Sequence, residues 1–355
     1  MKSSKVSRRG LLIGSSALVA GSAFSTRVLA AAPPASAITP QLIEAAKKEG
    51  KVVWYTSIDL KVSEEIAKTF EAKYPGVKVQ VERTGAERIL QRIGQEYQSN
   101  IHAVDVVNSS DASHLAYWKN QGLLAPYVPE DVAKYYPADH KDPDGTYASF
   151  RVFLCVIAYN SSLVKKEEAP KSFADLLKPQ WKGKIVKAHP GYSGTILTAT
   201  YQCSRDLGWG YFEKLAQQNV LQVQSAADPP KKIALGERAV QADGVEYIIL
   251  HEKESGQPVE PVYATEGTPL IIGPNGIFKA APNPNAARLF ESFCFTPECQ
   301  QLCIDIGGLR SAHPQAKEKA GRTPLSQIKL MKDDAAAVLK QGEQLKAHYV
   351  KLFHV

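Results

Sequence analysis

The stretch HPGYSGTILTATY, residues 189–201, places small hydroxyl residues directly before a segment that predicts a helix. The first backbone N–H groups of a helix have no partner within it, and the helix dipole adds partial positive charge there. A helix start of this kind binds phosphate, sulfate or carboxylate groups. The spacing therefore predicts that an anion is contacted by Tyr192, Ser193, Gly194 and Thr195.

Further polar residues follow the segments that predict strands. In a parallel sheet the carboxyl ends of the strands meet at one edge, where ligands bind. Ser and Thr also cap helices for structural reasons, so each group alone is a weak signal. Their repetition along one chain indicates a shared binding cleft. The candidate contacts from these strand ends are Tyr55, Thr56, Ser57, Thr84, Ser110, Asp243, Glu246 and Tyr247.

Three charged candidates have two interpretations each. The guanidinium of Arg151 suits bidentate pairing with a phosphate, phosphonate or carboxylate, and the alternative is a salt bridge between two lobes. Asp243 and Glu246 repel an anion, so as ligands they require a solute that also carries a positive end, such as an amine or a metal ion. Their alternative role is to cap a helix start.

The same residues do not match a catalytic pattern. A hydrolase needs a nucleophile with a base, or a metal-bound water. Ser193 lies outside any Gly-x-Ser-x-Gly elbow, and His189 precedes it across a Pro-Gly turn, which makes a weak base. The sequence also contains no HExxH, Walker or dinucleotide-binding glycine pattern. We expect a binding protein without a cofactor, and a periplasmic hydrolase is the distant alternative.

Residues 1–37 predict a cleaved export signal. Arg8 and Arg9 precede an apolar stretch over residues 11–20, and small-residue cleavage options follow, which indicates the twin-arginine route to the periplasm. This segment holds five of the 43 basic residues and none of the 36 acidic ones, so cleavage reduces the net charge from +7 to +2. A near-neutral chain argues against nucleic acid or an anionic membrane as a partner.

Alternating strand and helix patterns predict the fold class. Residues 51–57, 77–83 and 104–110 predict strands, and helices are predicted over 61–76 and 86–100. Such alternation indicates mainly parallel sheets with helices on both faces. The pattern restarts with a long strand-like segment over 150–164, and a final amphipathic helix is expected over 334–352. A chain of this length suits two lobes better than one core.

Together these segments resemble the periplasmic substrate-binding proteins of ABC importers, in the branch that contains ferric-ion-binding proteins and relatives for phosphorylated or phosphonate ligands. The resemblance covers about residues 51–310. The segments that carry it are VVWYTS, FEAKYPGVKVQ, DVVNSSDASHLAYWKNQGLLAPY, AYNSSLV, SFADLLKPQWKGKIV, GYSGT and GTPLIIGPNGIFKAAPNPNAARLFESFCFTPECQQ.

The resemblance implies a two-lobed α/β fold of the Venus-flytrap type, type II, with two hinge crossings and the ligand at the hinge. It also implies a monomer that captures a small anionic ligand by closing and delivers it to an ABC permease in the inner membrane. In the relatives a Ser-Gly step at a helix start of the second lobe holds the anion. The expected division is 38–155 with 264–325 for lobe 1, 156–263 for lobe 2, and 326–355 for a C-terminal helix packed on the lobes.

Ferric-ion binding is the alternative that the resemblance raises. The ferric proteins place two adjacent tyrosines where this chain has Glu246 and Tyr247, and a histidine or another ligand where it has Ile58-Asp59-Leu60. Ferric iron prefers several anionic oxygen ligands. The ligand set that this chain offers for it is Glu87, Asp243, Glu246 and Tyr247.

Overall fold

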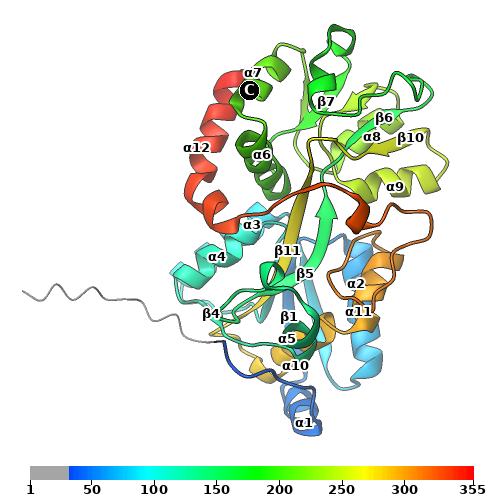
Figure 1. The fold of residues 1–355 in the computed structure, drawn as a ribbon. Coiled ribbons are helices and arrows are strands. Elements are labelled where there is room, and N and C mark those ends of the chain that lie inside the picture. Colours follow the sequence, from blue (N-terminus) through cyan, green and yellow to red (C-terminus); the bar gives the residue numbers. More distant parts are fainter. Residues whose placement is uncertain (1–31) are drawn as a thin grey trace, which may run out of the picture. The chain divides into compact units, whose positions relative to one another are not determined.

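The structure is a computed structural model that describes residues 32–355, so most of the predicted export signal lies outside the described residues. Two sheets organise this part of the chain (Figure 1). The first has the order β12-β11-β3-β1-β2, with β4 and β5 also paired to β11. Its strands are β1 (Lys51–Thr56), β2 (Lys78–Arg83), β3 (Val106–Asn108), β4 (Leu124–Ala125), β5 (Ala148–Leu154), β11 (Thr268–Phe278) and β12 (Leu330–Met331).

The second sheet has the order β10-β6-β9-β7-β8. We use lobe 1 for the first sheet with the helices from the same chain segments, and lobe 2 for the second sheet with its helices. The strands of lobe 2 are β6 (Ile157–Asn160), β7 (Ile185–Ala188), β8 (Leu221–Val223), β9 (Val240–Gln241) and β10 (Val259–Val262).

Helices come from the segments between these strands. Those of lobe 1 are α1 (Pro40–Glu49), α2 (Leu60–Lys73), α3 (Ala86–Gln98), α4 (Ala112–Asn120), α5 (Glu130–Tyr135), α10 (Pro284–Cys294) and α11 (Pro297–Asp305). Those of lobe 2 are α6 (Gly194–Asp206), α7 (Trp209–Ala216), α8 (Asp228–Ala234) and α9 (Glu246–Glu254), and the last helix is α12 (Ala335–Phe353). None of the described helices combines the length and the apolar character that a membrane span requires.

Strand pairing confirms the two-lobed α/β prediction and adds antiparallel pairs to it. β1 pairs in parallel with β2 and β3, and β7 pairs in parallel with β8 and β9. The strands next to the crossings pair antiparallel, β11 with β3 and β5, and β6 with β9 and β10. Both sheets are therefore mixed, because the chain leaves and re-enters each sheet through strands of opposite direction.

Two short connections carry the chain between the sheets. The segment that the sequence predicts as one strand over 150–164 is divided, because Cys155 and Val156 separate β5 from β6. The amide of Cys155 donates to the Pro269 carbonyl at 3.0 Å, and the amide of Val156 donates to the Gly244 carbonyl at 2.9 Å. The return lies between β10 and β11. Backbone hydrogen bonds thus fix the first crossing to β11 of lobe 1 and to the loop after β9 of lobe 2.

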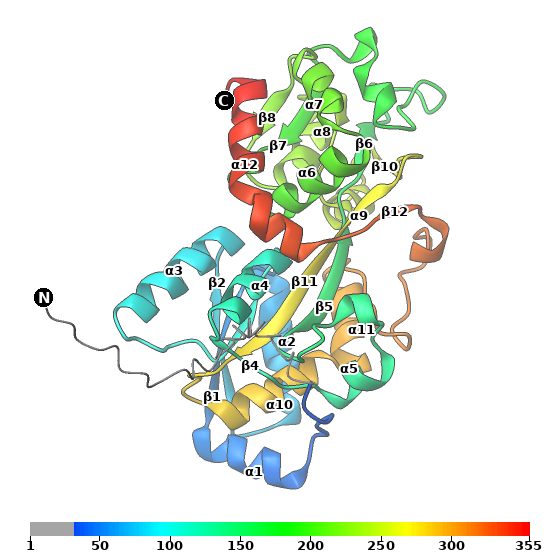
Figure 2. The same ribbon diagram turned by 60° about the vertical axis from the view of Figure 1, so that its left-hand side comes forward.

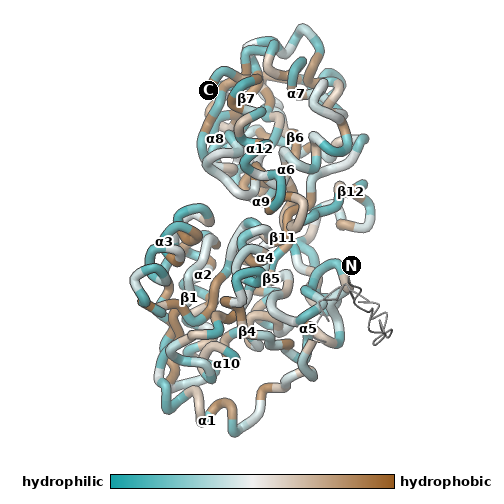
Figure 3. Tube along the Cα trace, turned by 90° about the vertical axis from the view of Figure 1, so that its left-hand side faces the viewer, coloured by the Kyte–Doolittle hydropathy of each residue, from teal (hydrophilic) through white to brown (hydrophobic). Residues whose placement is uncertain are grey.

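Local sequence signals explain how the elements begin and end, and α1 shows them clearly. The Thr39 side chain accepts a hydrogen bond from the Leu42 amide at 3.2 Å, and Pro40 opens the helix. Gly50 ends it with φ of 75°, a conformation that costs other residues free energy. In the core of lobe 1 the ring of Trp54 on β1 lies 5.1 Å from that of Phe290, centroid to centroid. Figure 3 shows the hydrophobic trace around β1.

The helix α12 contacts both lobes. It packs against α4 of lobe 1 and α6 of lobe 2, and Figures 1 and 2 show it running alongside α6. Its first turn is capped by Asp334, whose carboxylate accepts a hydrogen bond from the Ala337 amide at 2.9 Å. Near its end, the Tyr349 hydroxyl donates to Gln222 Oε1 at 2.7 Å. The predicted amphipathic C-terminal helix is thus present.

Glu291 on α10 provides a pH-dependent contribution to stability. Its side chain is buried, with Asn275 Nδ2 donating to one carboxylate oxygen at 3.3 Å, and burial raises its pKa to about 8. The unfolded chain releases the proton near pH 4.3, so between these values the folded state binds one more proton and stability falls as the pH rises. In the wild type this effect lowers the free energy of unfolding by up to about 1.4 kcal/mol per pH unit. We expect Glu291→Gln to remove this slope, measured by urea unfolding between pH 5 and 8. The exposed control Glu44→Gln should keep the slope, and an unchanged slope in Glu291→Gln would contradict the assignment.

Candidate functional site

Arg151 on β5 is a buried cation that pairs with no carboxylate in the part of the chain that the structure describes. Only 3% of its surface is exposed, and one terminal nitrogen donates a hydrogen bond to Ser57 Oγ at 2.8 Å. Its Nε is buried and has no partner, and no Asp or Glu among residues 32–355 forms an ion pair with it. Burial lowers the pKa of Arg151, because the charged form loses its hydration. A buried guanidinium with unused donors is a strong receptor for an anion.

Neighbouring strands hold this guanidinium in place. Gly273 of β11 lies opposite Arg151 in the ladder, and a Cβ atom there would come within 2.7 Å of Arg151 Cγ and Nε. The same position lies 3.2 Å from the Ser109 carbonyl oxygen, so the turn after β3 runs beside the site. The guanidinium carbon lies 5.3 Å from the ring centroid of Phe153. Glycine at 273 is therefore required by the space that Arg151 occupies.

Lobe 2 reaches the same site through α9. The ring of Tyr247, in the first turn of α9, lies edge-on to that of Phe153 with 6.4 Å between centroids. Burial raises the pKa of the Tyr247 hydroxyl, while the nearby positive charge of Arg151 opposes this shift. The structure thus brings together three predicted residues, Ser57, Arg151 and Tyr247, from both lobes.

A second arginine, which sequence reasoning did not select, lies near this group. Arg83 ends β2, and its Nε donates to the Ile58 carbonyl at 3.1 Å. Its charge contributes to the lowered pKa of Arg151, after burial. In the sequence, Arg83 could have been recognised as a basic residue at the end of a predicted parallel strand. Asp59, 3.9 Å from an Arg83 nitrogen, also lines an adjoining surface pocket of about 740 Å³ with residues of α2, α9 and α11.

The start of α6 has the form that the sequence predicts. Ser193 caps it, because its Oγ accepts from the Ile196 amide at 3.4 Å, and Gly194 and Thr195 are buried. Tyr192 projects outward with 62% of its surface exposed. A Cβ on Gly194 would lie 2.7 Å from Asp111 Cβ and 2.9 Å from Asp111 Oδ2. The anion next to this helix start in the structure is thus a carboxylate of lobe 1.

The remaining strand-end candidates contact the fold itself. The Tyr55 hydroxyl donates to Glu96 Oε1 at 2.8 Å, so this side chain faces α3 and not Arg151. Thr56 Oγ1 accepts from the Ile58 amide at 3.1 Å, which shapes the turn after β1. Thr84 and Ser110 are half-buried at the ends of β2 and β3. These two hydroxyls lie beside the turns that carry the site, and in the described part of the chain the guanidinium of Arg151 bonds to Ser57 and to neither of them.

Both acidic candidates of lobe 2 hold buried cations. Asp243 lies 2.6 Å from Lys187 Nζ and accepts from the Ala188 amide at 3.0 Å. Glu246 is fully buried and accepts from Arg310 at 2.7 and 2.9 Å, from Arg322 at 2.6 Å and from the Tyr263 hydroxyl at 2.5 Å. Burial alone would raise the pKa of Glu246, but these partners lower it. Its carboxylate oxygens are therefore occupied by partners within the chain.

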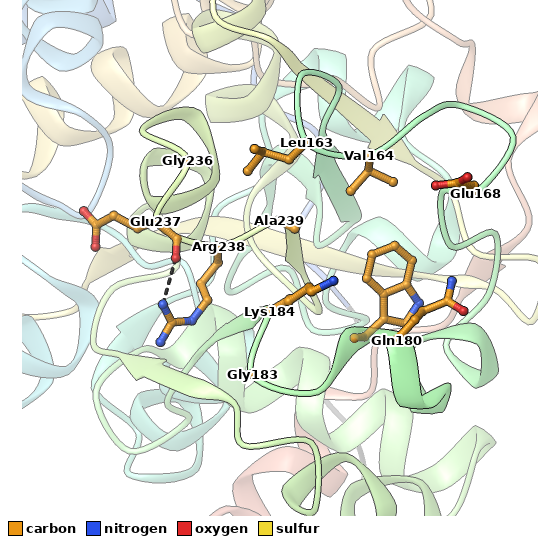
Figure 4. Close-up of a pocket in the computed structure, with 11 residues that line it drawn as sticks. Leu163, Val164, Glu168, Gln180, Gly183, Lys184, Gly236, Glu237, Arg238 and Ala239 are labelled. Atoms are coloured by element: carbon orange, nitrogen blue, oxygen red, sulfur yellow. Dashed lines mark hydrogen bonds between the residues drawn. The ribbon is translucent and has the colours of Figure 1, made fainter.

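Another pocket lies in lobe 2, away from the residues described above. It has a volume of about 680 Å³ and lies at the amino ends of β7 and β9, between residues 163–168, 180–184 and 236–239 (Figure 4). The Arg238 guanidinium beside it donates to the Glu237 carbonyl at 2.7 Å. Ligands of such sheets bind at the carboxyl ends of the strands, so the site around Arg151 is the better candidate.

Comparison with known proteins identifies the family. The profile described as bacterial extracellular solute-binding protein matches residues 102–328. A probable periplasmic-binding protein of an ABC transporter from Sinorhizobium fredii is 23% identical over 271 residues, which cover 74% of each chain. That relative is thus described as the binding protein of a transporter.

Solved structures agree with this result. The chain is similar to the periplasmic binding protein AfuA from Actinobacillus pleuropneumoniae with fructose-6-phosphate bound, with 27% identity and a TM-score of 0.76 over 86% of this chain and 99% of that one. Iron-bound HitA from Pseudomonas aeruginosa has a TM-score of 0.74, with 20% identity over 84% of this chain and 99% of that one. The latter likeness shows the fold alone.

Proposed function

The chain belongs to the bacterial extracellular solute-binding proteins, and from this premise we propose that its solute is a small organic anion whose phosphate head group binds Arg151. The protein delivers its solute to an ABC importer, as its family does. The observation that carries the proposal is the buried guanidinium with one hydrogen bond, to Ser57, and no carboxylate partner among the described residues.

Charge and chemistry favour phosphate as the head group. A guanidinium offers a planar pair of donors that matches two phosphate oxygens, and Arg83 adds positive charge nearby. The bound fructose-6-phosphate in AfuA, a protein 27% identical, supports a phosphorylated ligand class. Ser57, Arg151 and Tyr247 are the contacts that we propose, with Ser193, Gly194 and Thr195 as a second anion-binding element.

Capture proceeds by closure of the lobes. Arg151 and Ser57 belong to lobe 1, whereas Tyr247 and Gly194 belong to lobe 2. A solute that contacts both sets stabilises the closed form, because only that form presents all contacts at once. The protein acts as a monomer that docks on the permease after closure.

Export follows the twin-arginine route. Fractionation of cells that express the R8K/R9K precursor tests this route, and we expect the periplasmic form to be lost.

Ferric iron is the weaker alternative. In the set Glu87, Asp243, Glu246 and Tyr247, the carboxylate of Asp243 pairs with Lys187 and that of Glu246 with two arginines. A ferric site on these residues would compete with three buried cations for these carboxylates and would leave Arg310 and Arg322 with Glu318 as their remaining acidic partner, at a large cost in free energy. We assign Asp243 and Glu246 to the support of lobe 2.

Native mass spectrometry of the mature protein, purified without unfolding, tests the proposal together with a thermal-shift screen. We expect sugar phosphates or other phosphorylated metabolites to raise the melting temperature, whereas the matching unphosphorylated compounds leave it unchanged. A ligand at 100 times its Kd adds about 2.7 kcal/mol to stability. A visible charge-transfer band on addition of ferric salt, without a response to any phosphorylated compound, would favour the ferric alternative.

A further inference from the structure

Three ligand atoms of the usual metal-binding types converge beside α6, outside the contacts proposed for the solute. They belong to Glu87 on α3 and to Asp111 and His114 at the start of α4, and they all lie within 4.8 Å of one another. His114 Nε2 lies 3.4 Å from Glu87 Oε1 and 3.8 Å from Asp111 Oδ2. Ligands about 2.1 Å from a tetrahedral ion are separated by about 3.4 Å, so this spacing fits one ion with little movement.

Neighbouring groups orient two of these ligands. The other imidazole nitrogen of His114, Nδ1, lies 3.0 Å from Ser109 Oγ, which directs Nε2 toward the carboxylates. The other oxygen of Asp111, Oδ1, accepts from the Ser113 amide at 2.8 Å, which directs Oδ2 toward the imidazole. Fixing the second atom of each ligand in this way is typical of metal sites.

Among residues 32–355, the converging oxygens have no hydrogen-bond donor from outside this group of three residues. Asp111 is 1% exposed, and its Oδ2 is buried without a donor among residues 32–355. The same holds for Glu87 Oε1. Lys346 of α12 is the charged side chain that adds positive potential here, yet its ion pair is with Glu343. The buried carboxylate of Asp111 and the half-buried one of Glu87 thus face one imidazole, an arrangement that a divalent cation would complete.

We propose that Glu87, Asp111 and His114 bind a divalent transition-metal ion, of the class of Mn²⁺, Co²⁺ or Zn²⁺. Two carboxylate oxygens and one imidazole suit these ions, whereas Mg²⁺ and Ca²⁺ prefer oxygen ligands alone. The ligand set contains no tyrosine, so it differs from the ferric set considered above. All three ligands belong to lobe 1. The proposed metal site therefore does not depend on whether the solute carries a phosphate.

The position of the ion gives it a second effect, which rests on the proposed function. Asp111 Oδ2 lies beside Gly194, at the helix start that we propose as an anion-binding element. A bound cation would neutralise this carboxylate and so remove its repulsion of an anionic solute. Metal binding and solute binding are therefore expected to strengthen each other.

Isothermal titration of the untagged, chelator-treated mature protein with MnCl2, CoCl2 and ZnCl2 tests the site. We expect one ion per chain, visible absorption bands for Co²⁺, and binding at least about tenfold weaker in Asp111→Asn, His114→Gln and Glu87→Gln. His354→Gln, at the C-terminal end, is the control and should leave binding unchanged. Circular dichroism checks the fold of each variant, and half-buried Glu87 gives the variant with the smallest risk to it.

The outcomes separate the two proposals. Absence of stoichiometric binding in the wild type, or equal binding in all three ligand variants, would overturn the metal site. Metal binding without any change in solute affinity would overturn only the coupling to the solute. Failure of every phosphorylated compound to bind, with one Co²⁺ ion still bound per chain, would overturn the proposed solute and leave the metal site intact.

Discussion

Glu246→Ala should destabilise the protein by about 3–5 kcal/mol, because it removes the buried counter-charge of Arg310 and Arg322 and leaves the half-buried Glu318 as their remaining acidic partner. The Arg310 backbone bonds to Val152 of β5 in both directions, and its side chain binds Glu246 at the start of α9. This carboxylate therefore ties lobe 2 to β5 of lobe 1. Urea unfolding followed by circular dichroism measures the loss.

Two comparisons make this first prediction specific. Glu343→Ala removes an exposed carboxylate that pairs with Lys346, and we expect it to change stability by less than about 0.5 kcal/mol. Glu246→Gln keeps the size of the side chain but loses its charge, so it should fall between the wild type and Glu246→Ala. Wild-type stability in Glu246→Ala, combined with lost solute affinity, would show instead that Glu246 contacts the solute.

Arg151→Met should weaken the binding of an anionic solute by about 100-fold or more, which corresponds to roughly 3 kcal/mol for a buried charged contact. The same substitution should leave the stability of the solute-free protein equal or higher, since it replaces an unpaired buried charge with an apolar side chain of similar length. Calorimetric titration and thermal unfolding measure the two effects separately.

Arg205→Met is the matched control for Arg151→Met. Arg205 lies on the surface of α6, where it pairs with Asp206 at 2.6 Å, and its removal should not change solute affinity. Unchanged affinity in Arg151→Met, or a large loss of stability without a loss of affinity, would show that Arg151 supports the fold and does not bind the solute.

Local features of the site were predictable from the sequence. Ser193 lies where a helix start needs a capping hydroxyl, and the structure shows this hydrogen bond. Asp111, the cap of α4, and His114, in its first turn, were not selected from the sequence, although their spacing of three residues was visible there. The order of strands and helices predicted the two lobes, because periodicity depends only on neighbours along the chain.

Long-range pairing was beyond sequence patterns. Glu246 was compatible with solute binding or capping, and its partners Arg310 and Arg322 lie 64 and 76 residues away in the sequence. Arg151 remained either a ligand or a salt bridge until the structure showed Ser57 as its hydrogen-bond partner, 94 residues away. Glu87 likewise joins Asp111 and His114 from a different helix. Such contacts follow from how the sheets bring segments together, which no local pattern records.

The most direct test of the central claim is a calorimetric titration of the mature protein with fructose 6-phosphate and, separately, with fructose. The phosphate on Arg151 should supply most of the binding free energy, so fructose 6-phosphate should bind through its phosphate group. Fructose should be at least about 100-fold weaker. Equal affinity for both sugars, or binding of fructose 6-phosphate that Arg151→Met does not weaken, would contradict this claim.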